Sequence, residues 1–365
     1  RRPPEPKVAG SIPVGRTIYD NDMINLLDLT KKDLASLIDD KPYRAEQIFT
    51  WIYGKGIRDI DKMSNIPRQL RQEISSRAEI RYPSVADSKR SSDGTEKIAY
   101  SLADGSIIES VLIPEKDHWS ICISSQVGCA MGCTFCCTAT LGFRRNLSLG
   151  EIVSQVLYPV HTYPDRHFRN VVFMGMGEPL LNYATVVEAI RILSDPDGPG
   201  ISKRRITVST CGIIEPLKSL WKDTGAGLAI SLNAPSQAKR IKIMPVTRKY
   251  PLTDLIDALK NYQMPNRRRI TIEYVLLGGV NDSAEDAREL IKLMSGLKVK
   301  VNLIPLNPWP GCPYEAPDEK TVLAFEERLK DSPIAVMLRK EKGNDISAAC
   351  GQLAGGTVHV DKKAC

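Results

Sequence analysis

From about residue 119 onward, short apolar segments alternate with amphipathic ones, and this alternation restricts the possible folds more than any other feature. Six segments are predicted strands, at 120–126, 170–177, 205–212, 227–234, 270–279 and 299–308, and a seventh follows at 335–340. Amphipathic helices are predicted between them, at 148–160, 183–194, 215–222, 252–262, 284–295 and 318–330. Repeated β-α units imply a parallel sheet with right-handed crossovers. The sequence therefore predicts an α/β fold with a partial (β/α)6-type barrel over 116–340, whose functional residues lie at the carboxyl ends of the strands.

Two smaller units are predicted before the barrel. Residues 19–85 hold three short helical segments, the first from about residue 22, and Thr30 with Asp33 gives an N-cap signal. Apolar segments at 97–102 and 106–114 flank an Ala-Asp-Gly turn, which predicts a β-hairpin extension over 86–115. We therefore expect a helical accessory RNA-binding domain followed by a short β extension. The remaining ends of the chain are expected to be a flexible tail at 1–18 and a C-terminal loop at 341–365.

Overall composition limits the class of protein. Apolar residues form 42% of the 365 residues and charged residues 25%, which excludes global disorder. No apolar run reaches the ~18 residues that a membrane span needs. The net charge of +7 permits a nucleic-acid partner without requiring one. Five of the nine cysteines lie between residues 122 and 137, which favours a metal or redox site in a reducing compartment over a disulfide framework. A cytoplasmic protein is therefore expected.

The sharpest local signal is a triplet of cysteines, Cys129, Cys133 and Cys136, spaced four and three residues apart. Three thiolates at this spacing can converge from one loop. A cubane iron–sulfur cluster can be held by three thiolates with one iron left open, whereas a structural zinc site usually has four protein ligands. Spacing alone leaves two alternatives, a zinc site completed by a distant residue and three unrelated cysteines in a loop.

Longer sequence blocks extend this signal to a family. The cysteine loop followed by Gly-Phe at 142–143, together with GMGEPL at 175–180, resembles the radical S-adenosylmethionine (SAM) superfamily. Blocks in the expected order resemble the RlmN family, at 122–129, 144–156, 171–182, 203–213, 228–235, 302–311 and 345–355. The resemblance covers about residues 20–360. It implies methylation of C2 of an adenosine in the peptidyl transferase centre of large-subunit ribosomal RNA, and of the adenosine 3′ to the anticodon in a subset of tRNAs.

The resemblance also implies cofactors and the residues that bind them. Cys129, Cys133 and Cys136 would hold one 4Fe–4S cluster, whose open iron binds SAM. A one-electron donor such as flavodoxin would trigger cleavage of SAM to a radical, and two SAM molecules would be used per turnover, one as methyl donor and one as radical source. The implied SAM contacts are Gly177, Glu178, Ser209, Ser231, Leu232, Asn233 and Asn307. Without the resemblance, these residues would be ordinary strand ends and turns.

Three further residues receive catalytic roles from the resemblance. Cys350 would carry the methyl group on its sulfur, Cys122 would resolve the RNA-bound intermediate through a transient disulfide with Cys350, and Glu109 would accept a proton. The residue types alone allow plainer interpretations: a buried loop thiol for Cys350, a strand-core cysteine for Cys122, and an outward-facing strand residue for Glu109.

Other features bear on partners and on rival functions. Basic clusters at 144–145, 203–205 and 267–269 are candidates for phosphate contacts with RNA, or else solvated surface. Asn233, Cys137 and Cys211 differ from the residues commoner in the family, and Cys211 is interpreted as structural or incidental. The rival functions are Cfr-type methylation of C8 of the same ribosomal adenosine, and a non-catalytic, zinc-dependent RNA-binding protein. A monomer without membrane association is expected.

Overall fold

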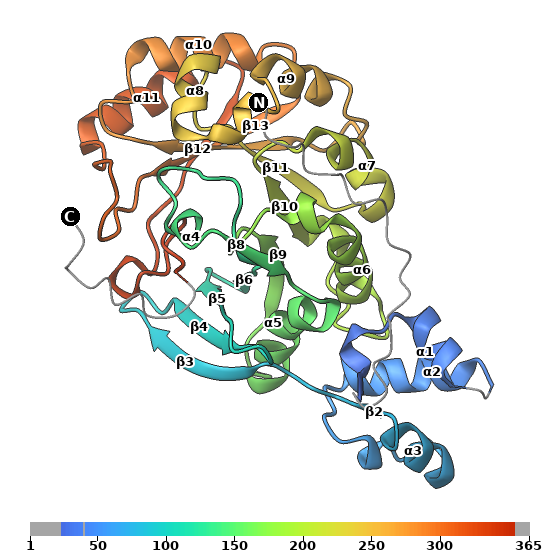
Figure 1. The fold of residues 1–365 in the computed structure, drawn as a ribbon. Helices are drawn as coiled ribbons and strands as arrows, with labels where there is room; N and C mark the ends of the chain where they lie inside the picture. The colour runs from blue at the N-terminus through green and yellow to red at the C-terminus, as the bar shows by residue number, and fades with distance from the viewer. Residues whose placement is uncertain (1–22, 39–40, 355–365) are drawn as a thin grey trace, which may run out of the picture.

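The computed structural model describes residues 23–38 and 41–354. Its largest sheet has ten strands (Figure 1). Its barrel part consists of β6 (Trp119–Cys122), β9 (Phe168–Phe173), β10 (Ile206–Thr210), β11 (Gly227–Ser231), β12 (Ile270–Leu276), β13 (Val299–Pro305) and β14 (Ala335–Leu338). These seven strands are neighbours in this order and all run parallel. Within the described residues β14 ends the sheet without pairing to β6. The predicted partial barrel is therefore confirmed, while the predicted tail at 1–18 lies outside the described residues.

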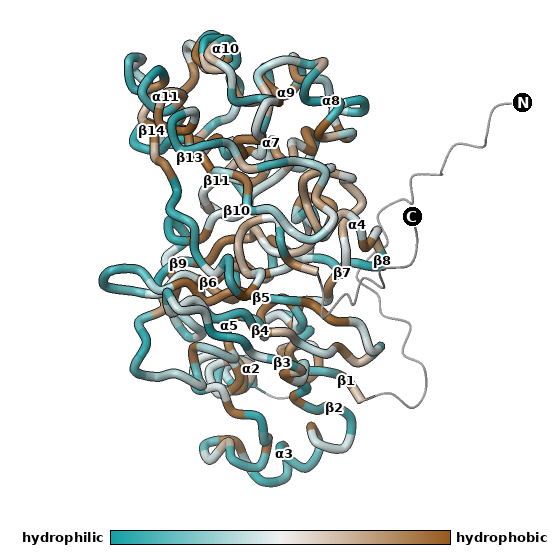
Figure 2. The backbone as a smooth tube through the Cα atoms, turned by 90° about the vertical axis from the view of Figure 1, so that its left-hand side faces the viewer, coloured by the Kyte–Doolittle hydropathy of each residue, from teal (hydrophilic) through white to brown (hydrophobic). Residues whose placement is uncertain are grey.

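Six amphipathic helices connect the barrel strands. They are α5 (Leu149–Thr162), α6 (Tyr183–Ser194), α7 (Ile214–Thr224), α9 (Leu252–Lys260), α10 (Ala284–Met294) and α11 (Glu319–Lys330). All six predicted helices are confirmed, with ends within two residues of those expected. Ser148 and Ser283 start two of them with capping boxes to Glu151 and Asp286. Figure 2 shows hydrophobic residues gathered in strands such as β6 and β9, as expected for a parallel sheet covered by helices.

Among the elements not expected from the sequence, four short ones lie in the barrel region. They are β7 (Gln126–Gly128), α4 (Cys137–Thr140), β8 (Phe143–Asn146) and α8 (Gln237–Ile243). Strands β7 and β8 pair antiparallel and flank the cysteine loop, so they hold its two ends together. Each element is too short to show a clear hydrophobic period, which is why the sequence pattern misses it.

The amino-terminal domain combines short helices with a small parallel ladder. Its elements are β1 (Ile24–Asn25), η1 (Leu26–Asp28), α1 (Lys31–Leu37), α2 (Tyr43–Phe49), η2 (Thr50–Gly54), η3 (Ile60–Lys62), α3 (Arg68–Ser75) and β2 (Ala78–Glu79). The predicted cap is confirmed, because Thr30 and Asp33 form a capping box at α1. The predicted helical start near residue 22 is wrong: the chain first pairs β1 with β2 and then makes a tight turn, which the Asn25 side chain caps.

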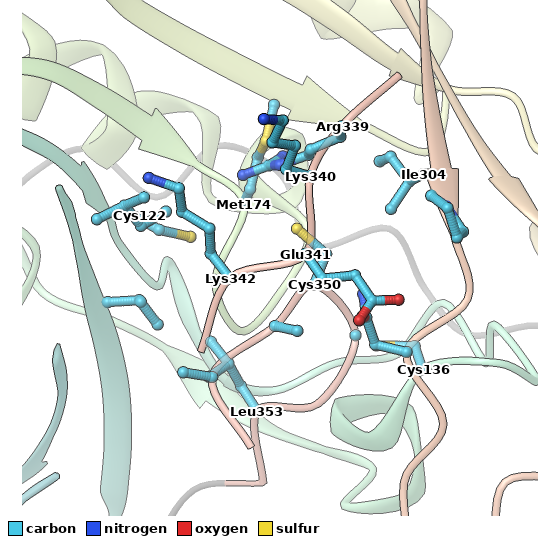
Figure 3. A pocket seen from close by; sticks show the side chains of 18 of the residues that line it. Cys122, Cys136, Met174, Ile304, Arg339, Lys340, Glu341, Lys342, Cys350 and Leu353 are labelled. Carbon is cyan, nitrogen blue, oxygen red and sulfur yellow. The ribbon is translucent and has the colours of Figure 1, made fainter. Parts of the chain in front are cut away.

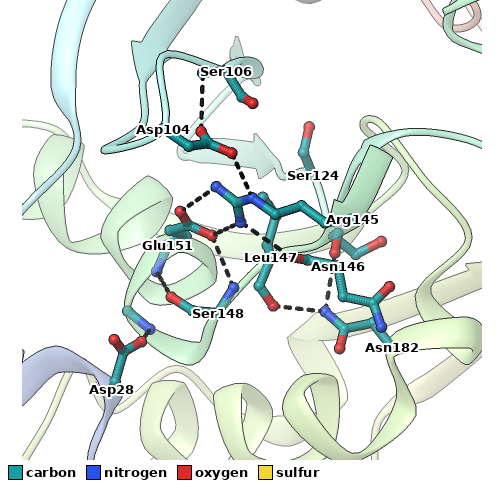
Figure 4. A network of polar contacts seen from close by, with 12 residues as sticks. Asp28, Asp104, Ser106, Ser124, Arg145, Asn146, Leu147, Ser148, Glu151 and Asn182 are labelled. Carbon is teal, nitrogen blue, oxygen red and sulfur yellow. Dashed lines mark hydrogen bonds and ion pairs between the residues drawn. The ribbon is translucent and has the colours of Figure 1, made fainter. Parts of the chain in front are cut away.

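Polar contacts dock this domain onto the barrel. The amide of Gly150, at the start of α5, donates to Asp28 Oδ1 at 2.8 Å, and Lys31 pairs with Asp195 and Asp197 at 2.8 and 2.9 Å. Figure 4 shows Asp28 beside the first turn of α5, close to a network around Arg145. In that network the guanidinium of Arg145 binds both Glu151 and Asp104.

An antiparallel extension continues the sheet beyond β6. It consists of β5 (Ile107–Pro114), β4 (Glu96–Ser101) and β3 (Ser84–Arg90), and β5 pairs directly with β6. The predicted hairpin across residues 103–105 is confirmed. Strand β3 was not predicted, because all seven of its side chains are exposed and its sequence does not alternate. No helix of the described residues is long and apolar enough to cross a membrane.

Candidate active site

The three cysteines of the triplet line one cavity. Their loop is fixed at both ends, because the amide of Cys129 donates to the Gly142 carbonyl at 2.8 Å and that of Thr134 donates to Ile243 at 3.0 Å. No three His, Cys, Asp or Glu side chains in the described parts of the chain are placed to hold a single metal ion.

The chemistry of this donor set suits an iron–sulfur cluster. Burial raises the pKa of Cys129 to about 12, and it also raises the pKa of Cys136. Neutral buried thiols become thiolates when a metal binds them, so cluster loading would release protons. The cavity has about 900 Å³ of space between its walls, a figure that includes open solvent.

The opposite wall of this cavity is formed by the carboxyl ends of the barrel strands. Gly177 and Glu178 follow β9, and Gly177 adopts φ +100°, where a Cβ atom would lie 2.5 Å from Gln126. The Glu178 carboxylate is buried and accepts hydrogen bonds from the amides of Cys211 and Leu180 at 2.7 and 3.0 Å. Burial raises the pKa of this carboxyl group. Gly177 thus serves the turn, and both residues also face the cavity.

The other implied SAM contacts divide into two groups. Ser209, Ser231 and Asn233 line the cavity with the thiols, and the two serine hydroxyls lie 3.5 Å apart across β10 and β11. Asn233 has a left-handed backbone with φ 58°, which asparagine tolerates well, and its Oδ1 accepts from the Val275 amide at 2.8 Å. By contrast, Leu232 is fully buried and does not line this cavity.

A second cavity adjoins the first and contains the two predicted catalytic cysteines. Cys122, the last residue of β6, and Cys350 both line it, and Figure 3 shows their thiols facing one another. The pKa of Cys122 is raised to about 12, mainly by burial and secondly by the neighbouring Cys350. Asn307 also lines this cavity, and its buried Oδ1 has no hydrogen-bond partner among the described residues. Such an unpaired acceptor is expected where a ligand with N–H donors binds.

Glu109 is buried on β5 at 3% exposure, so its interpretation as an outward-facing strand residue is wrong. Its carboxylate lies 3.2 Å from Lys97 Nζ and accepts from the Ala354 amide at 2.8 Å. It lines neither cavity. Glu109 therefore contacts the loop that carries Cys350 rather than the cavity itself.

The sequence alone did not identify several residues that lie in or beside the site. Cys211, which had no functional role in the sequence analysis, lines the first cavity with its sulfur 3.9 Å from that of Cys133. Arg339 lines both cavities, and the neighbouring Cys350 thiol is the main cause of a raised pKa of its guanidinium. Arg240 is fully buried and donates to carbonyls at the ends of β10 and β11. No sequence signal separates Arg240 from its exposed basic neighbours.

The basic clusters lie in different places. Residues 203–205 and 267–269 directly precede β10 and β12, at the amino ends of the strands and therefore opposite the thiols. The cluster at 144–145 lies on β8, beside the cysteine loop. There Arg145 is engaged by acidic side chains, and Arg144 is exposed. Arg144 is thus the basic-cluster residue best placed for RNA near the site.

Comparisons with known proteins agree with this geometry. The family model for the radical SAM superfamily matches residues 123–293, and that for the ribosomal RNA large subunit methyltransferase N-terminal domain matches residues 24–80. The dual-specificity RNA methyltransferase RlmN of Solidesulfovibrio magneticus is 49% identical over 91% of this chain and 96% of its own length. The RlmN of Lawsonia intracellularis is 50% identical over the same shares.

A solved structure supports the same assignment. The crystal structure of a radical SAM methyltransferase from Sphaerobacter thermophilus superposes with a TM-score of 0.86 at 40% identity, covering 91% of this chain and all of the other. Membership of the superfamily implies a 4Fe–4S cluster and SAM as cofactors, and the three cavity-lining thiols fit such a cluster. The chain belongs to the RlmN family and is a radical SAM RNA methyltransferase.

Proposed function

We propose that this enzyme methylates C2 of an adenosine in large-subunit ribosomal RNA and of the adenosine 3′ to the anticodon in a subset of tRNAs, with Cys350 as methyl carrier. The observation that most supports this is the place of Cys350, which lines both the cavity of the cluster thiols and the cavity of Cys122. A methyl group on this sulfur is thus accessible from both sides. The match of residues 24–80 to the amino-terminal domain of ribosomal RNA methyltransferases supports C2 over Cfr-type C8 chemistry.

Cys129, Cys133 and Cys136 would hold the cluster, and Gly177, Glu178 and the strand-end residues Ser209, Ser231, Leu232, Asn233 and Asn307 would contact SAM. When bound, cluster and SAM supply the one-electron chemistry that activates the methyl group of Cys350. Two SAM molecules per turnover are proposed, one for methylation of Cys350 and one for this activation. Leu232 could contribute only through its backbone, because its side chain is fully buried.

Cys350, Cys122 and Glu109 carry the later steps. The Cys350 sulfur acts as a nucleophile toward the first SAM methyl group. One hydrogen atom of the Cys350 methyl group would pass to the radical that bound SAM supplies, and the resulting methylene carbon would bond to C2 of adenine. The C2 proton would then pass to Glu109, and the one remaining unpaired electron would return to the oxidised cluster. The Cys122 thiolate then attacks the Cys350 sulfur, forming a disulfide. The sulfur–methylene bond breaks, and its electron pair stays on the methylene carbon, which takes a proton and becomes the product methyl group.

The proposed partners follow from the same chemistry. The substrates are ribosomal RNA and tRNA, and the target adenosine must leave its stack to enter the cavity. A one-electron donor such as flavodoxin would supply reducing equivalents. We further propose a cytoplasmic monomer.

The test uses anaerobically purified enzyme with a chemical reductant, SAM, and either a ribosomal RNA fragment or tRNA. Mass spectrometry of the digested RNA should show 2-methyladenosine in both substrates. Appearance of 8-methyladenosine would support the Cfr-type alternative, and unmodified RNA from iron-loaded protein would overturn the proposal.

Variants test the carrier mechanism directly. Cys122→Ala should accumulate a covalent protein–RNA adduct, visible as a slow band on a denaturing gel, because no second thiol can release the product. Cys350→Ala should give neither adduct nor methylated RNA. Cys312→Ala is the matched control, since Cys312 lines neither cavity, and it should behave like the wild type. Normal RNA methylation by Cys122→Ala would refute its role as resolving thiol.

A further inference from the structure

Cys211 contacts one of the three thiols that would hold the cluster. Its sulfur lies 3.9 Å from the sulfur of Cys133, which is within hydrogen-bonding distance for two sulfur atoms. Both side chains line the first cavity. Cys133 belongs to a small apolar cluster with Phe135 and Met244, and Cys211 packs against the same cluster. A residue that directly follows β10 thus contacts a sulfur of the cysteine loop.

The backbone of Cys211 is held on both sides. Its amide donates to Glu178 Oε2 at 2.7 Å, and its carbonyl accepts from the guanidinium of Arg240 at 2.7 Å. Both of these partners are buried. Because the backbone is fixed, the contact between the two sulfurs costs only the rotational freedom of short side chains.

Only Cys211 can be the donor in this pair once Cys133 binds iron. Cysteine binds a metal as the thiolate, so the bound Cys133 sulfur carries no proton and acts only as an acceptor. The thiol of Cys211 is a weak S–H donor. A hydrogen bond to a charged acceptor is stronger than one to a neutral acceptor, so this contact would strengthen when a cluster is bound.

The other two cysteines of the triplet have donors from the backbone of their own loop. Burial raises the pKa of Cys129, and a backbone hydrogen bond from Met131 partly offsets that rise. The same holds for Cys136 and the backbone of Ala139. The middle cysteine of the triplet has the Cys211 thiol as its partner, which comes from the barrel instead of the loop.

We propose that Cys211 is a positioning residue for electron transfer, whose S–H···S hydrogen bond to Cys133 raises the reduction potential of the cluster. This inference rests on the proposed function, in which Cys133 is a cluster ligand. Hydrogen bonds to the sulfurs are among the factors that set the potential of an iron–sulfur cluster. The reduced cluster carries one more negative charge than the oxidised cluster, so the bond stabilises the reduced form more.

The electron balance of this step is simple. One electron comes from the one-electron donor, and no proton or chemical bond is exchanged with Cys211. The Cys211 thiol keeps its proton throughout, so it acts through Cys133 and not on SAM or RNA.

The test measures reduction of the cluster in the absence of SAM and RNA, so its result does not depend on the methylation chemistry. Cys211→Ala and Cys211→Val both remove the donor, and Val also fills the space that a water molecule could take. Cys211→Ser keeps a hydroxyl donor. Cys312→Ala is the matched control, because Cys312 packs against the same apolar cluster but lines neither cavity. Each anaerobically reconstituted protein is titrated with dithionite and redox mediators, and electron paramagnetic resonance measures the reduced cluster.

The variants without a donor should be harder to reduce. At a fixed potential, the ratio of reduced to oxidised cluster should fall about two- to fivefold in Cys211→Ala and Cys211→Val, as expected for loss of one weak hydrogen bond. For a one-electron couple this change corresponds to a midpoint potential lower by about 18–41 mV. Iron and acid-labile sulfide should match the wild type in both variants. Cys211→Ser should restore most of the ratio, and Cys312→Ala should not change it.

Two results would overturn the inference. One is a midpoint potential in Cys211→Ala and Cys211→Val that equals the wild-type value. The other is loss of iron in Cys211→Ala, which would make Cys211 a ligand and not a hydrogen-bond donor. Failure of the proposed function looks different, because then the wild type holds no cluster or Cys133→Ala holds as much iron as the wild type, and either result would overturn both proposals.

Discussion

Replacing Arg240 with Met should destabilise the whole barrel, although Arg240 contacts no predicted catalytic group. The side chain is fully buried, and its guanidinium donates to the carbonyls of Cys211, Ser231 and Leu232 at 2.7, 3.2 and 3.0 Å. It also donates to the Thr247 hydroxyl at 2.8 Å. Methionine fills a similar volume but donates no hydrogen bond. The carbonyls of Cys211 and Ser231 would then lose this donor, whereas the carbonyl of Leu232 would keep the amide of Ala234, which lies at 2.8 Å.

The size of the effect follows from those contacts. A buried acceptor left without a donor costs about 1–3 kcal/mol, so two carbonyls give about 2–6 kcal/mol. The substitution also removes an expensive buried charge, whose burial lowers the pKa of Arg240. Because that removal offsets part of the cost, we expect a net loss of about 2–4 kcal/mol in the free energy of unfolding.

Urea unfolding followed by circular dichroism measures this loss. With a slope of about 3 kcal/mol per molar urea, the midpoint should fall by about 0.7–1.3 M. Arg248→Met is the control, because Arg248 is exposed in the turn that follows α8, and it should change stability by less than about 0.5 kcal/mol. Equal midpoints for the two variants would refute the reasoning.

Three further predictions concern the site. Replacing Cys129, Cys133 or Cys136 with Ala should abolish loading of iron and acid-labile sulfide, and full iron content in any of these variants would contradict the cluster assignment. Because the pKa of Cys122 is about 12, its alkylation in the folded protein should accelerate about tenfold per pH unit between about pH 8 and 11; a plateau below pH 9 would mean an ordinary exposed thiol. Arg144→Gln should lower the salt dependence of RNA binding by about one unit of slope. Joint replacement of Arg267 and Arg269 by Gln should leave that slope unchanged for a short RNA, and the reverse pattern would place the RNA at the amino ends of the strands.

The fold was predictable because its strands and helices repeat a strong period. Helices such as α5 and α10 carry apolar faces and capping boxes, so their limits follow from local chemistry. The first turn of the amino-terminal domain was not predictable in this way. Leu26 and Leu27 look like part of a helical face, but the partner that makes β1 a strand lies more than fifty residues away. Long-range pairing of this kind leaves no local signal.

The same distinction between local sequence signals and long-range contacts applies to the candidate site. The residues at strand ends and in the cysteine loop follow from motif and topology, because parallel strands bring their carboxyl ends together. The sequence could not predict the positions of Lys97, Arg240 and Arg339, because an isolated basic residue is usually interpreted as part of the solvated surface. Only the three-dimensional structure shows that each of them faces buried acceptors, a carboxylate or thiols.

The loop that carries Cys350 forms hydrogen bonds with residues of the same chain that are synthesised much earlier. Its contacts with Asp93, Lys97 and Glu109 join residues about 250 positions apart. Every barrel strand and all three cluster cysteines precede this loop in the chain, and proteins fold progressively as they leave the ribosome at about 5–20 residues per second. The last barrel strand ends at Leu338, twelve residues before Cys350, so the barrel strands are complete about 0.6–2.4 s of synthesis before the proposed methyl carrier. A chain truncated before residue 343 would keep the three proposed cluster thiols but lack the proposed carrier, so translation order alone would make the proposed methylation step the last part of the enzyme to mature.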